Sequence, residues 1–256
     1  MTRAQRLAEL LDRLVSSGEL VVEDTADHFG VSTATIRRDL DHLASQQLLT
    51  RTHGGAVPNS TSYDLPMRYK SSSRTNAKIR IARAAVEMLW PGCAVSLNGG
   101  TTTLEIARAL PAAAALSTGI TLVTNALNIA TELTVRPHIK IMVCGGVARP
   151  QSYELVGPIA AQTLGQLTVD VCFLGAYGLD LAAGITTSDE GESAINRVLV
   201  QQAKRTVAVL DSAKLGQVGF SRICHVGEVD ALITDSDADP NVLAELERQQ
   251  VEVVIA

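Results

Sequence analysis

Apolar residues recur at helical spacing in three segments near the start of the chain. Each segment carries one apolar stripe among polar residues: Leu7, Leu10, Leu11 and Leu14; Val21, Ala26 and Phe29; and Ile36, Leu40 and Leu43. Spacings that are mostly three or four residues place such side chains on one face of a helix. We therefore predict three amphipathic helices, which bury these stripes in a small common core.

The ends of these helices are marked by residues with special backbone or capping roles. Gly30 stands where the second helix would end, and Ser32 can cap the third with its side-chain oxygen. Beyond the third helix, Leu48–Arg51 and Ala56–Val57 have the pattern of short strands, with a Gly-Gly turn between them. This order of helix, turn, helix and hairpin predicts a winged helix-turn-helix, a unit that reads DNA.

The third predicted helix would enter the major groove. Ala34 is small enough to let its open face approach DNA closely, and arginine can make a bidentate contact with guanine. An arginine pair on a helix is more often a solvated face, so the prediction depends on the whole ordered series of elements. The residues expected at DNA are Ser32 and Thr33 on phosphates, Thr35, Arg37 and Arg38 in the groove, and Arg51 and His53 on the wing.

Charge restricts how this unit could bind DNA. Residues 1–60 carry six Lys/Arg against eight Asp/Glu, a net charge of −2, and the whole chain has a net charge of −5. The basic coating that is typical of non-specific DNA binders is therefore missing. Residues 61–84 hold six basic side chains against one acidic, and most of these fit a solvated linker. Affinity would depend on a few placed arginines and on two or more copies of the chain.

Strands and helices alternate after a linker that is rich in proline, serine and threonine. The expected strands are Ala94–Leu97, Ile120–Val123, Ile139–Val143, Val171–Leu174, Thr206–Leu210, Ala231–Ile233 and Val251–Ile255. The expected helices are Ala77–Leu89, Thr103–Leu110, Ala126–Leu133, Pro158–Leu164, Glu190–Ala203 and Asn241–Gln249. We predict a DNA-binding domain at residues 1–57, a linker at 58–76 and, at 77–256, an open, mostly parallel α/β sheet with helices on both faces.

Composition narrows the class of protein further. Aromatic residues make up 3% of the chain, which favours an aliphatic core. The chain has neither a run of about 18 apolar residues nor an apolar signal core, so we expect a cytoplasmic protein with no membrane partner. Cys93, Cys144, Cys172 and Cys224 are widely spaced with no CxxC pair, which favours reduced structural thiols over a disulfide framework or a metal site.

Ligands of open α/β sheets bind beyond the carboxyl ends of the strands. There the segment 98–103 reads Asn-Gly-Gly-Thr-Thr-Thr and runs into a helix. Its backbone N–H groups, its hydroxyls and the helix dipole would form a phosphate cradle, although a threonine-rich helix cap would look the same. The residues that we expect to bind a small phosphorylated ligand at this edge are Asn98, Gly99, Gly100, Thr101, Thr102, Thr103, Thr124, Asn125, Gly145, Gly146, Gly175 and Lys214.

The chain resembles the DeoR family of bacterial transcriptional regulators from about residue 5 to residue 235. The segments that carry the resemblance are GVSTATIRRDLDHL, LLTRTHGGA, Gly100–Thr103, Thr124-Asn125, Gly145-Gly146 and DSAKLG at 211–216. The resemblance implies a winged helix-turn-helix joined to a sugar-phosphate-sensing domain, similar to ribose-5-phosphate isomerase and CoA transferase folds. It also implies that Lys78, at the start of the helix before the first strand, would hold the ligand's phosphate together with the glycine-threonine loop.

Three positions depart from the pattern of that family. Asn98 stands where an aspartate usually precedes the loop, Ala77 where a glutamate commonly precedes the lysine, and Asn196 where a lysine is frequent. The carboxylate that would bind sugar hydroxyls or act as an isomerase base is thus missing at position 98, and no pair of carboxylates is evident at that edge. We therefore predict no catalytic residues, and no cofactor or metal.

These patterns together predict a sequence-specific, DNA-binding repressor of a carbohydrate-metabolism operon. A phosphorylated sugar or related metabolite would release it from double-stranded operator DNA, to which it would bind as a homodimer or a higher homo-oligomer. One alternative is a sugar-phosphate isomerase or CoA-transferase-like enzyme with an added N-terminal domain. Another is a regulator that has lost its ligand or that activates transcription. The sequence leaves the sugar, the operon and the oligomer number open.

Overall fold

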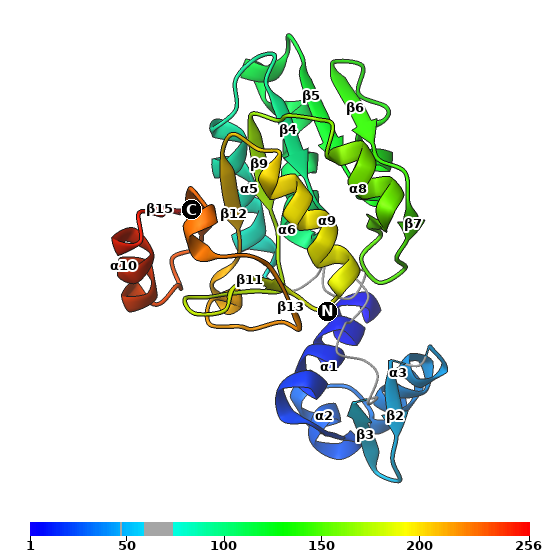
Figure 1. Ribbon diagram of the computed structural model, residues 1–256. Coiled ribbons are helices and arrows are strands. Elements are labelled where there is room, and N and C mark those ends of the chain that lie inside the picture. The colour runs from blue at the N-terminus through cyan, green and yellow to red at the C-terminus, as the bar shows by residue number, and fades with distance from the viewer. Residues whose placement is uncertain (47, 59–73) are drawn as a thin grey trace. The chain divides into compact units, whose positions relative to one another are not determined.

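The computed structural model divides into two compact units, Met1–Ser73 and Arg74–Ala256 (Figure 1). It describes residues 1–46, 48–58 and 74–256. Most of the predicted linker, 58–76, therefore lies outside the described residues, and so do Arg68 and Lys70 of the basic run. Each unit has a hydrophobic core of its own, and the two are described separately.

Within its described residues, 1–46 and 48–58, the first unit combines three helices with a three-stranded antiparallel sheet. Its elements are α1 (Arg3–Ser17), β1 (Leu20–Val21), α2 (Val22–Phe29), α3 (Thr33–Ser45), β2 (Leu49–Arg51) and β3 (Gly55–Pro58), with the strand order β1-β3-β2. The predicted stripes of α1 and α3 are buried in one core. The three predicted helices and the hairpin are thus confirmed, and β1 adds a third strand to the wing.

One position of the predicted middle stripe is wrong. Val21 lies in β1, pairs with Gly55 and leaves 43% of its surface exposed, whereas Val22 is buried at the start of α2. Successive side chains of a strand point to opposite faces, so Val22 and not Val21 turns toward the core. Gly30 follows α2 in the left-handed conformation, at φ 61°, and Ser32 caps α3 as predicted.

Two arginines of α1 pair with one buried aspartate of α3. Asp39 of α3 is 2% exposed and lies 3.1 Å from Arg3 Nε and 2.7 Å from Arg6 Nε. Both guanidinium groups donate hydrogen bonds to its carboxylate, which compensates the cost of burying the charge. These two arginines therefore hold the unit together, which leaves fewer basic side chains for DNA.

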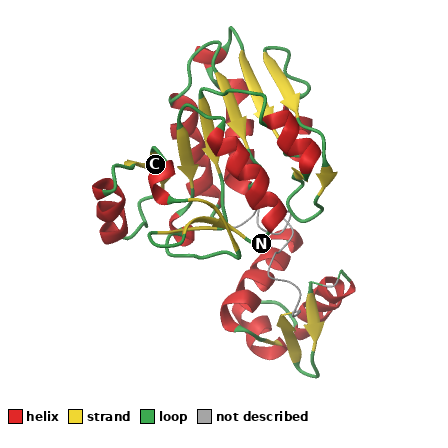
Figure 2. Ribbon diagram, viewed as in Figure 1, coloured by secondary structure: helices red, strands yellow, loops and turns green. Residues whose placement is uncertain are grey.

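The second unit is a seven-stranded parallel sheet with helices on both faces (Figure 2). The strand order is β15-β14-β12-β9-β4-β5-β6, and α8 and α9 cover one face while α5 and α6 cover the other (Figure 1). The strands are β4 (Ala94–Leu97), β5 (Ile120–Thr124), β6 (Ile139–Val143), β9 (Val171–Leu174), β12 (Thr206–Val209), β14 (Ala231–Thr234) and β15 (Glu252–Ile255). The α-helices are α5 (Thr75–Glu87), α6 (Thr101–Ala109), α7 (Leu127–Leu133), α8 (Pro158–Leu164), α9 (Glu190–Gln201) and α10 (Pro240–Arg248). The predicted open α/β sheet is confirmed.

The sequence pattern missed two small sheets and several short helical turns. The strands β7 (Val147–Ala148) and β8 (Leu155–Val156) form a hairpin, and β10 (Gly178–Asp180), β11 (Gly184–Thr187) and β13 (Ser221–Cys224) form an antiparallel sheet. Strands of two to four residues are too short to show an alternating pattern. The 3₁₀ turns are η1 (Leu110–Ala112), η2 (Ala114–Leu116), η3 (Ser212–Lys214) and η4 (Val226–Glu228).

The core of the second unit is mostly aliphatic, with Phe173 as a buried aromatic residue, and every residue of β9 and β12 is buried. The four cysteines lie in it as buried, unpaired thiols. Burial raises the pKa of Cys144 and Cys172 to about 11 and that of Cys224 to about 12, so these thiols stay protonated at neutral pH. Among the described helices, none combines the length and the apolar character that a membrane crossing requires.

Candidate functional site

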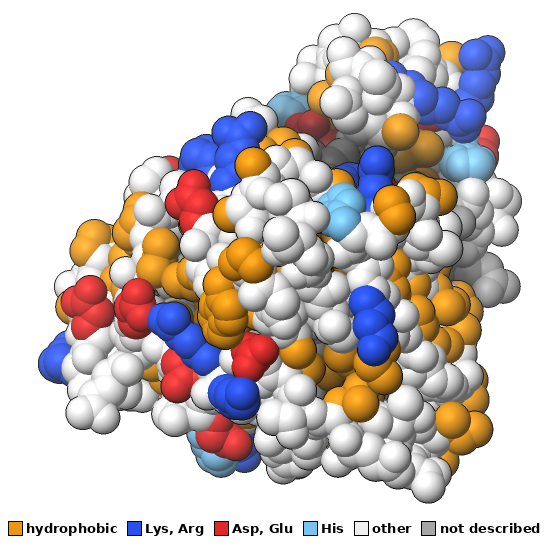
Figure 3. All heavy atoms as spheres, turned by 90° about the horizontal axis from the view of Figure 1, so that it is seen from above, with side chains coloured by type: hydrophobic (Ala, Val, Ile, Leu, Met, Phe, Trp, Pro, Cys, Tyr) orange, Lys and Arg blue, Asp and Glu red, His pale blue; other side chains and the backbone are white. Residues whose placement is uncertain are grey.

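The face of α3 opposite its buried stripe is exposed. Arg37 and Arg38 lie there beside Ala34, while Ile36 and Leu40 are buried. Among the described residues, no acidic side chain forms an ion pair with either of these two arginines. Arg37 and Arg38 therefore offer DNA two placed charges on one exposed face of the helix. On the separate face of the molecule that Figure 3 displays, basic and acidic side chains are interspersed with apolar ones.

The start of α3 is capped by residues that were also expected at DNA. Ser32 Oγ accepts a hydrogen bond from Thr35 N at 3.2 Å and lies 2.9 Å from Thr35 Oγ1. Ser32 and Thr33 are exposed, whereas Thr35 is half-buried. The cap fixes the first turn of α3, where free backbone N–H groups suit a phosphate.

Arg51 and His53 lie in different settings on the wing. Arg51 Nε donates a hydrogen bond to Asp41 Oδ1 of α3 at 2.9 Å, and its Nη1 donates to Gly55 O. Arg51 thus ties the hairpin to α3, while His53 is exposed. A Cβ at Gly55 would lie 1.7 Å from Leu20 O, so β3 can pass β1 only with a glycine at this position.

In the second unit, Asn98 joins the ends of two neighbouring strands, β4 and β9. Its side chain is buried, its Oδ1 accepts a hydrogen bond from Gly175 N at 2.8 Å, and its Nδ2 donates to Gly175 O at 2.9 Å. An aspartate could accept the first bond but could not donate the second. The asparagine at this position therefore has a structural role of its own.

Glu154 brings a carboxylate to the same loop, and the sequence analysis did not single it out. It lies between β7 and β8, is 1% exposed, and accepts a hydrogen bond from Gly99 N through Oε1 at 2.6 Å. A Cβ at Gly99 would lie 2.5 Å from Glu154 Cγ, so the carboxylate reaches the loop only because residue 99 is glycine. Gly99 was a signal of close approach in the sequence, but nothing in it pointed to residue 154.

Polar side chains from two further segments face Glu154: Asn125 after β5, and Glu192 and Asn196 of α9. Burial and the charge of Glu192 raise the pKa of Glu154 well above its usual value. The N–H of Gly99 and the two asparagine side chains act in the opposite direction, but more weakly. Glu154 therefore holds its proton more tightly than an exposed glutamate does.

Glu192 is a second carboxylate beside Glu154, and both of its oxygens have polar partners. Arg149 Nη1 lies 2.9 Å from Glu192 Oε1, and Thr187 Oγ1 donates to Glu192 Oε2 at 2.8 Å. Arg149 Nε also lies 3.0 Å from Asp189 Oδ2. The expectation that this edge holds no pair of carboxylates is wrong, because the fold brings Glu154 and Glu192 together from separate segments.

Two of the threonines expected at the ligand are engaged in shaping the loop ends. Thr103 Oγ1 donates to Gly100 O at 3.1 Å. Thr124 Oγ1 donates to Leu97 O at 2.7 Å and accepts from Ala126 N at 3.0 Å. These hydroxyls fix the ends of β4 and β5. Because the hydroxyls are already hydrogen-bonded, the backbone N–H groups at the start of α6 are better placed than the hydroxyls to bind an anion.

The other small residues expected at this edge differ in exposure. Thr101 is half-buried and Thr102 is buried in the first turn of α6, while Gly145 and Gly146 are exposed after β6. A Cβ at Gly146 would lie 2.7 Å from Val156 O, and its φ is 138°. Gly146 therefore lets β8 pack closely, which helps to place the hairpin that carries Glu154.

The two lysines expected at the ligand lie on different elements. Lys78 is buried on α5, and Lys214 ends η3 beyond β12, with its Nζ 5.3 Å from the centre of the Tyr177 ring. Within the described ranges, no group of three or more His, Cys, Asp or Glu side chains is placed to hold a metal ion.

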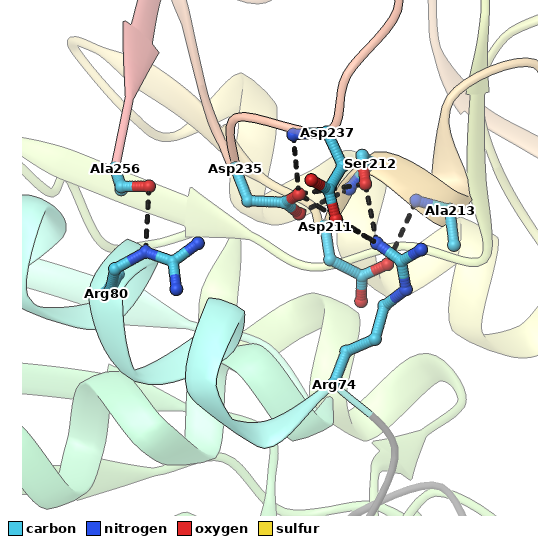
Figure 4. A network of polar contacts seen from close by, with 8 residues as sticks. All are labelled: Arg74, Arg80, Asp211, Ser212, Ala213, Asp235, Asp237 and Ala256. Atoms are coloured by element: carbon cyan, nitrogen blue, oxygen red, sulfur yellow. Dashed lines mark hydrogen bonds and ion pairs between the residues drawn. The ribbon is translucent and has the colours of Figure 1, made fainter.

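A network of charged and polar contacts lies at the start of the second unit (Figure 4). Arg74 Nη1 donates to Ser212 Oγ at 2.6 Å and lies 3.8 Å from Asp235 Oδ1 and from Asp237 Oδ2. Although burial opposes it, hydrogen bonds from Ser212 and Asp237 and the charge of Arg74 lower the pKa of Asp235. The network ties Arg74 to the loop that carries Lys214.

Comparison with known proteins gives the family of this chain. A model of the DeoR-like helix-turn-helix domain matches residues 6–62, and a model of the DeoR C-terminal sensor domain matches residues 73–236. The chain belongs to the DeoR family. The predicted resemblance is confirmed, and this DeoR-family chain is a DNA-binding transcriptional regulator with a sensor domain.

Relatives align with nearly the whole of this DeoR-family chain. The HTH-type transcriptional regulator GlpR of Haloferax volcanii is 36% identical over 256 residues, which cover 99% of this chain and 98% of the relative. The glycerol-3-phosphate regulon repressor of Escherichia coli K12 is 29% identical over 253 residues, 99% of each chain. A solved ribose 5-phosphate isomerase from Methanocaldococcus jannaschii aligns at 16% identity and a TM-score of 0.41, over 56% of this chain and 55% of its own.

Proposed function

We propose that this DeoR-family regulator represses a carbohydrate-metabolism operon and leaves its operator when a phosphorylated sugar or polyol binds the sensor unit. The observation that carries the proposal is the exposed Arg37–Arg38 face of a capped helix, in one chain with a glycine-threonine loop at the strand ends of a parallel sheet. The name of the glycerol-3-phosphate regulon repressor supports a phosphorylated small molecule as effector. Such a regulator acts in the cytoplasm, where its DNA lies.

For DNA binding, α3 lies in the major groove with Arg37 and Arg38 toward the base edges, because arginine suits bidentate contact with guanine. The net charge of −2 over residues 1–60 gives little non-specific attraction. Two or more copies on repeated half-sites therefore supply the affinity. Thr35 accompanies the arginines in the groove, and the remaining contacts come from Ser32, Thr33, Arg51 and His53.

In the sensor unit, the ligand's phosphate lies at the start of α6. The Gly100–Thr103 turn offers backbone N–H groups and the positive end of the helix dipole, and Lys78 supplies a countercharge. Release from the operator requires that the ligand bind the DNA-free state more tightly than the DNA-bound state. The contact between Arg74 and Ser212 offers a route for this coupling, since it joins the start of α5 to the loop of Lys214.

A second candidate, an isomerase-like enzyme, is favoured by one observation, the proximity of Glu154 and Glu192. Acid–base catalysis needs groups that are free to exchange a proton with the substrate. Glu192 is instead bound by Arg149 and Thr187, which hold it in a structural role. We therefore propose that the chain is not an enzyme. Turnover of ribose 5-phosphate in a spectrophotometric isomerase assay would contradict this.

Footprinting and mobility-shift assays on the DNA upstream of neighbouring genes test the DNA-binding part. Arg38→Ala should weaken operator binding at least about 30-fold, because each lost arginine–guanine contact costs about 1–3 kcal/mol and two subunits lose one each. Arg248→Ala, which removes an exposed arginine of α10, is the matched control and should bind like the wild type. A normal footprint from a folded Arg38→Ala protein would show that the recognition helix is wrongly assigned.

Thermal-shift measurements with sugar and polyol phosphates test the sensing part. At least one compound should raise the melting temperature of the wild type and also release the operator in the mobility-shift assay. If no compound does either, the sensing part of the proposal is wrong, while the DNA-binding part stands on its own result.

A further inference from the structure

We infer that Glu154, together with Asn125 and Asn196, recognises the hydroxyl-bearing part of the phosphorylated effector. On this inference Glu154 does the work of the aspartate that position 98 lacks. The inference rests on the proposed sensing function. It adds the residues that determine which ligand binds, and it places them beside the Gly100–Thr103 turn.

The three side chains are buried polar groups with unused hydrogen-bonding atoms. Their exposed fractions are 0% for Asn125, 1% for Glu154 and 2% for Asn196. Among the described residues, no partner meets the geometry of a hydrogen bond for Asn125 Oδ1 and Nδ2, Glu154 Oε2 or Asn196 Oδ1, although both asparagine side chains lie near enough to lower the pKa of Glu154. Buried polar atoms in proteins are nearly always paired, and leaving them unpaired costs free energy. Four such atoms on three facing side chains therefore indicate a ligand that supplies their partners.

The position of the cluster formed by Asn125, Glu154 and Asn196 follows from the hydrogen bond between Glu154 and Gly99. Glu154 Oε1 lies 2.6 Å from Gly99 N, and Gly99 directly precedes the Gly100–Thr103 turn. Asn98 is already committed to Gly175 through both of its polar atoms. The carboxylate at this edge therefore comes from Glu154 of the β7–β8 hairpin, and it lies beside the Gly100–Thr103 turn that is suited to a phosphate.

The chemistry of the unpaired atoms favours hydroxyl groups. Asn125 offers one donor and one acceptor, and Asn196 offers an acceptor. Glu154 Oε2 can accept a hydrogen bond when ionised or donate one when protonated. A hydroxyl can donate and accept, so neighbouring hydroxyls satisfy all of these atoms, whereas an ammonium group can only donate.

Charge limits the ligand to one phosphate at this end. Glu192 lies beside Glu154 of the cluster, and the guanidinium of Arg149 is shared between Glu192 and Asp189. The groups described around the cluster are thus net negative and would repel a second phosphate. The expected effector is a sugar or polyol monophosphate whose hydroxyls lie beside Glu154.

Calorimetric titration of the full chain tests the inference. The probes are glycerol 3-phosphate, ribose 5-phosphate, fructose 6-phosphate, glucosamine 6-phosphate, fructose 1,6-bisphosphate and inorganic phosphate. The wild type should bind one of the first three at least tenfold more tightly than the last three. Glu154→Ser should weaken that binding at least tenfold and leave the affinity for inorganic phosphate within twofold. Glu190→Ser, which removes an exposed carboxylate of α9, is the matched control and should change neither value.

The possible failures point to different errors. If the wild type binds a sugar monophosphate and Glu154→Ser binds it equally well, the role of Glu154 is overturned while the sensing function stands. Tightest binding of the bisphosphate would overturn the limit to one phosphate, and tightest binding of the amino sugar would overturn the preference for hydroxyls. If Glu154→Ser does not fold, Asn196→Ala replaces it, and unchanged affinity in that variant overturns the inference. If no probe binds, the sensing function fails and the inference fails with it.

Discussion

The DNA-binding unit and the strand ends of the sensor unit use buried carboxylates in opposite ways. Asp39 is buried, but Arg3 and Arg6 neutralise it, and the arginines expected at DNA remain exposed. Glu154 is buried beside side chains with unpaired atoms, and none of the described ion pairs includes it. A buried charge with partners serves the fold, whereas buried polar atoms without partners indicate a missing ligand. The comparison separates a structural carboxylate from one that is placed to bind.

The largest effect on stability is expected at Asp39. Asp39→Asn removes the charge that pairs with Arg3 and Arg6, and the first unit should lose about 3 kcal/mol of unfolding free energy. Asp41→Asn is the matched control, because Asp41 also pairs with an arginine but its side chain is 65% exposed. That change should cost less than about 1 kcal/mol. Urea denaturation followed by circular dichroism measures both, and equal losses would contradict the structural role given to Asp39.

A smaller loss is expected when position 98 receives an aspartate. Asn98→Asp leaves Gly175 O without its donor and places a new charge in a buried position. The sensor unit should lose about 2 kcal/mol at neutral pH, because a buried acceptor is left unpaired. Part of this loss should be recovered as the pH falls, because burial raises the pKa of the new carboxyl and its protonated form can donate to Gly175 O. Asn241→Asp, at an exposed position of α10, is the control. A similar loss of unfolding free energy in both variants would argue against a stabilising role for the hydrogen bonds between Asn98 and Gly175.

The smallest and most specific effect is in the pH dependence of the sensor unit. Burial and Glu192 raise the pKa of Glu154, so the folded chain holds this proton more tightly than the unfolded chain. The resulting stability is complete below the unfolded pKa of about 4.3 and is lost as the pH rises through the folded pKa. Glu154→Gln cannot titrate, so its stability relative to the wild type should increase with pH. A difference that stays constant with pH would show that Glu154 keeps an ordinary pKa.

Much of the fold could be predicted because its elements leave local patterns. The strands Ile139–Val143 and Val171–Leu174 and the helix Pro158–Leu164 have the predicted bounds. Buried parallel strands have continuous apolar runs in the sequence. Gly30 marks the end of α2, and Ser32 marks the start of α3. The β7–β8 hairpin could not be predicted in this way, because its two-residue strands show no periodicity.

The candidate sites were predictable to different degrees. Arg37 and Arg38 could be placed from the period of a single helix, since residues opposite a buried stripe must face solvent. Arg51 was predicted only as a DNA contact, but its bond to Asp41 depends on how the hairpin packs against α3. Glu154 was missed because no local pattern relates it to Gly99.

The sequence by itself determined a winged helix-turn-helix and a parallel α/β unit with a glycine-threonine loop at a strand end. Each helix, strand and turn in these units depends on the spacing of residues within its own short segment, and that spacing can be read from the sequence. Only the tertiary structure decided that Asn98 clamps Gly175, 77 positions away, and that Glu154 reaches Gly99, 55 positions away. The chemistry of these groups comes from burial and from neighbours on other segments, and both exist only once the chain has packed.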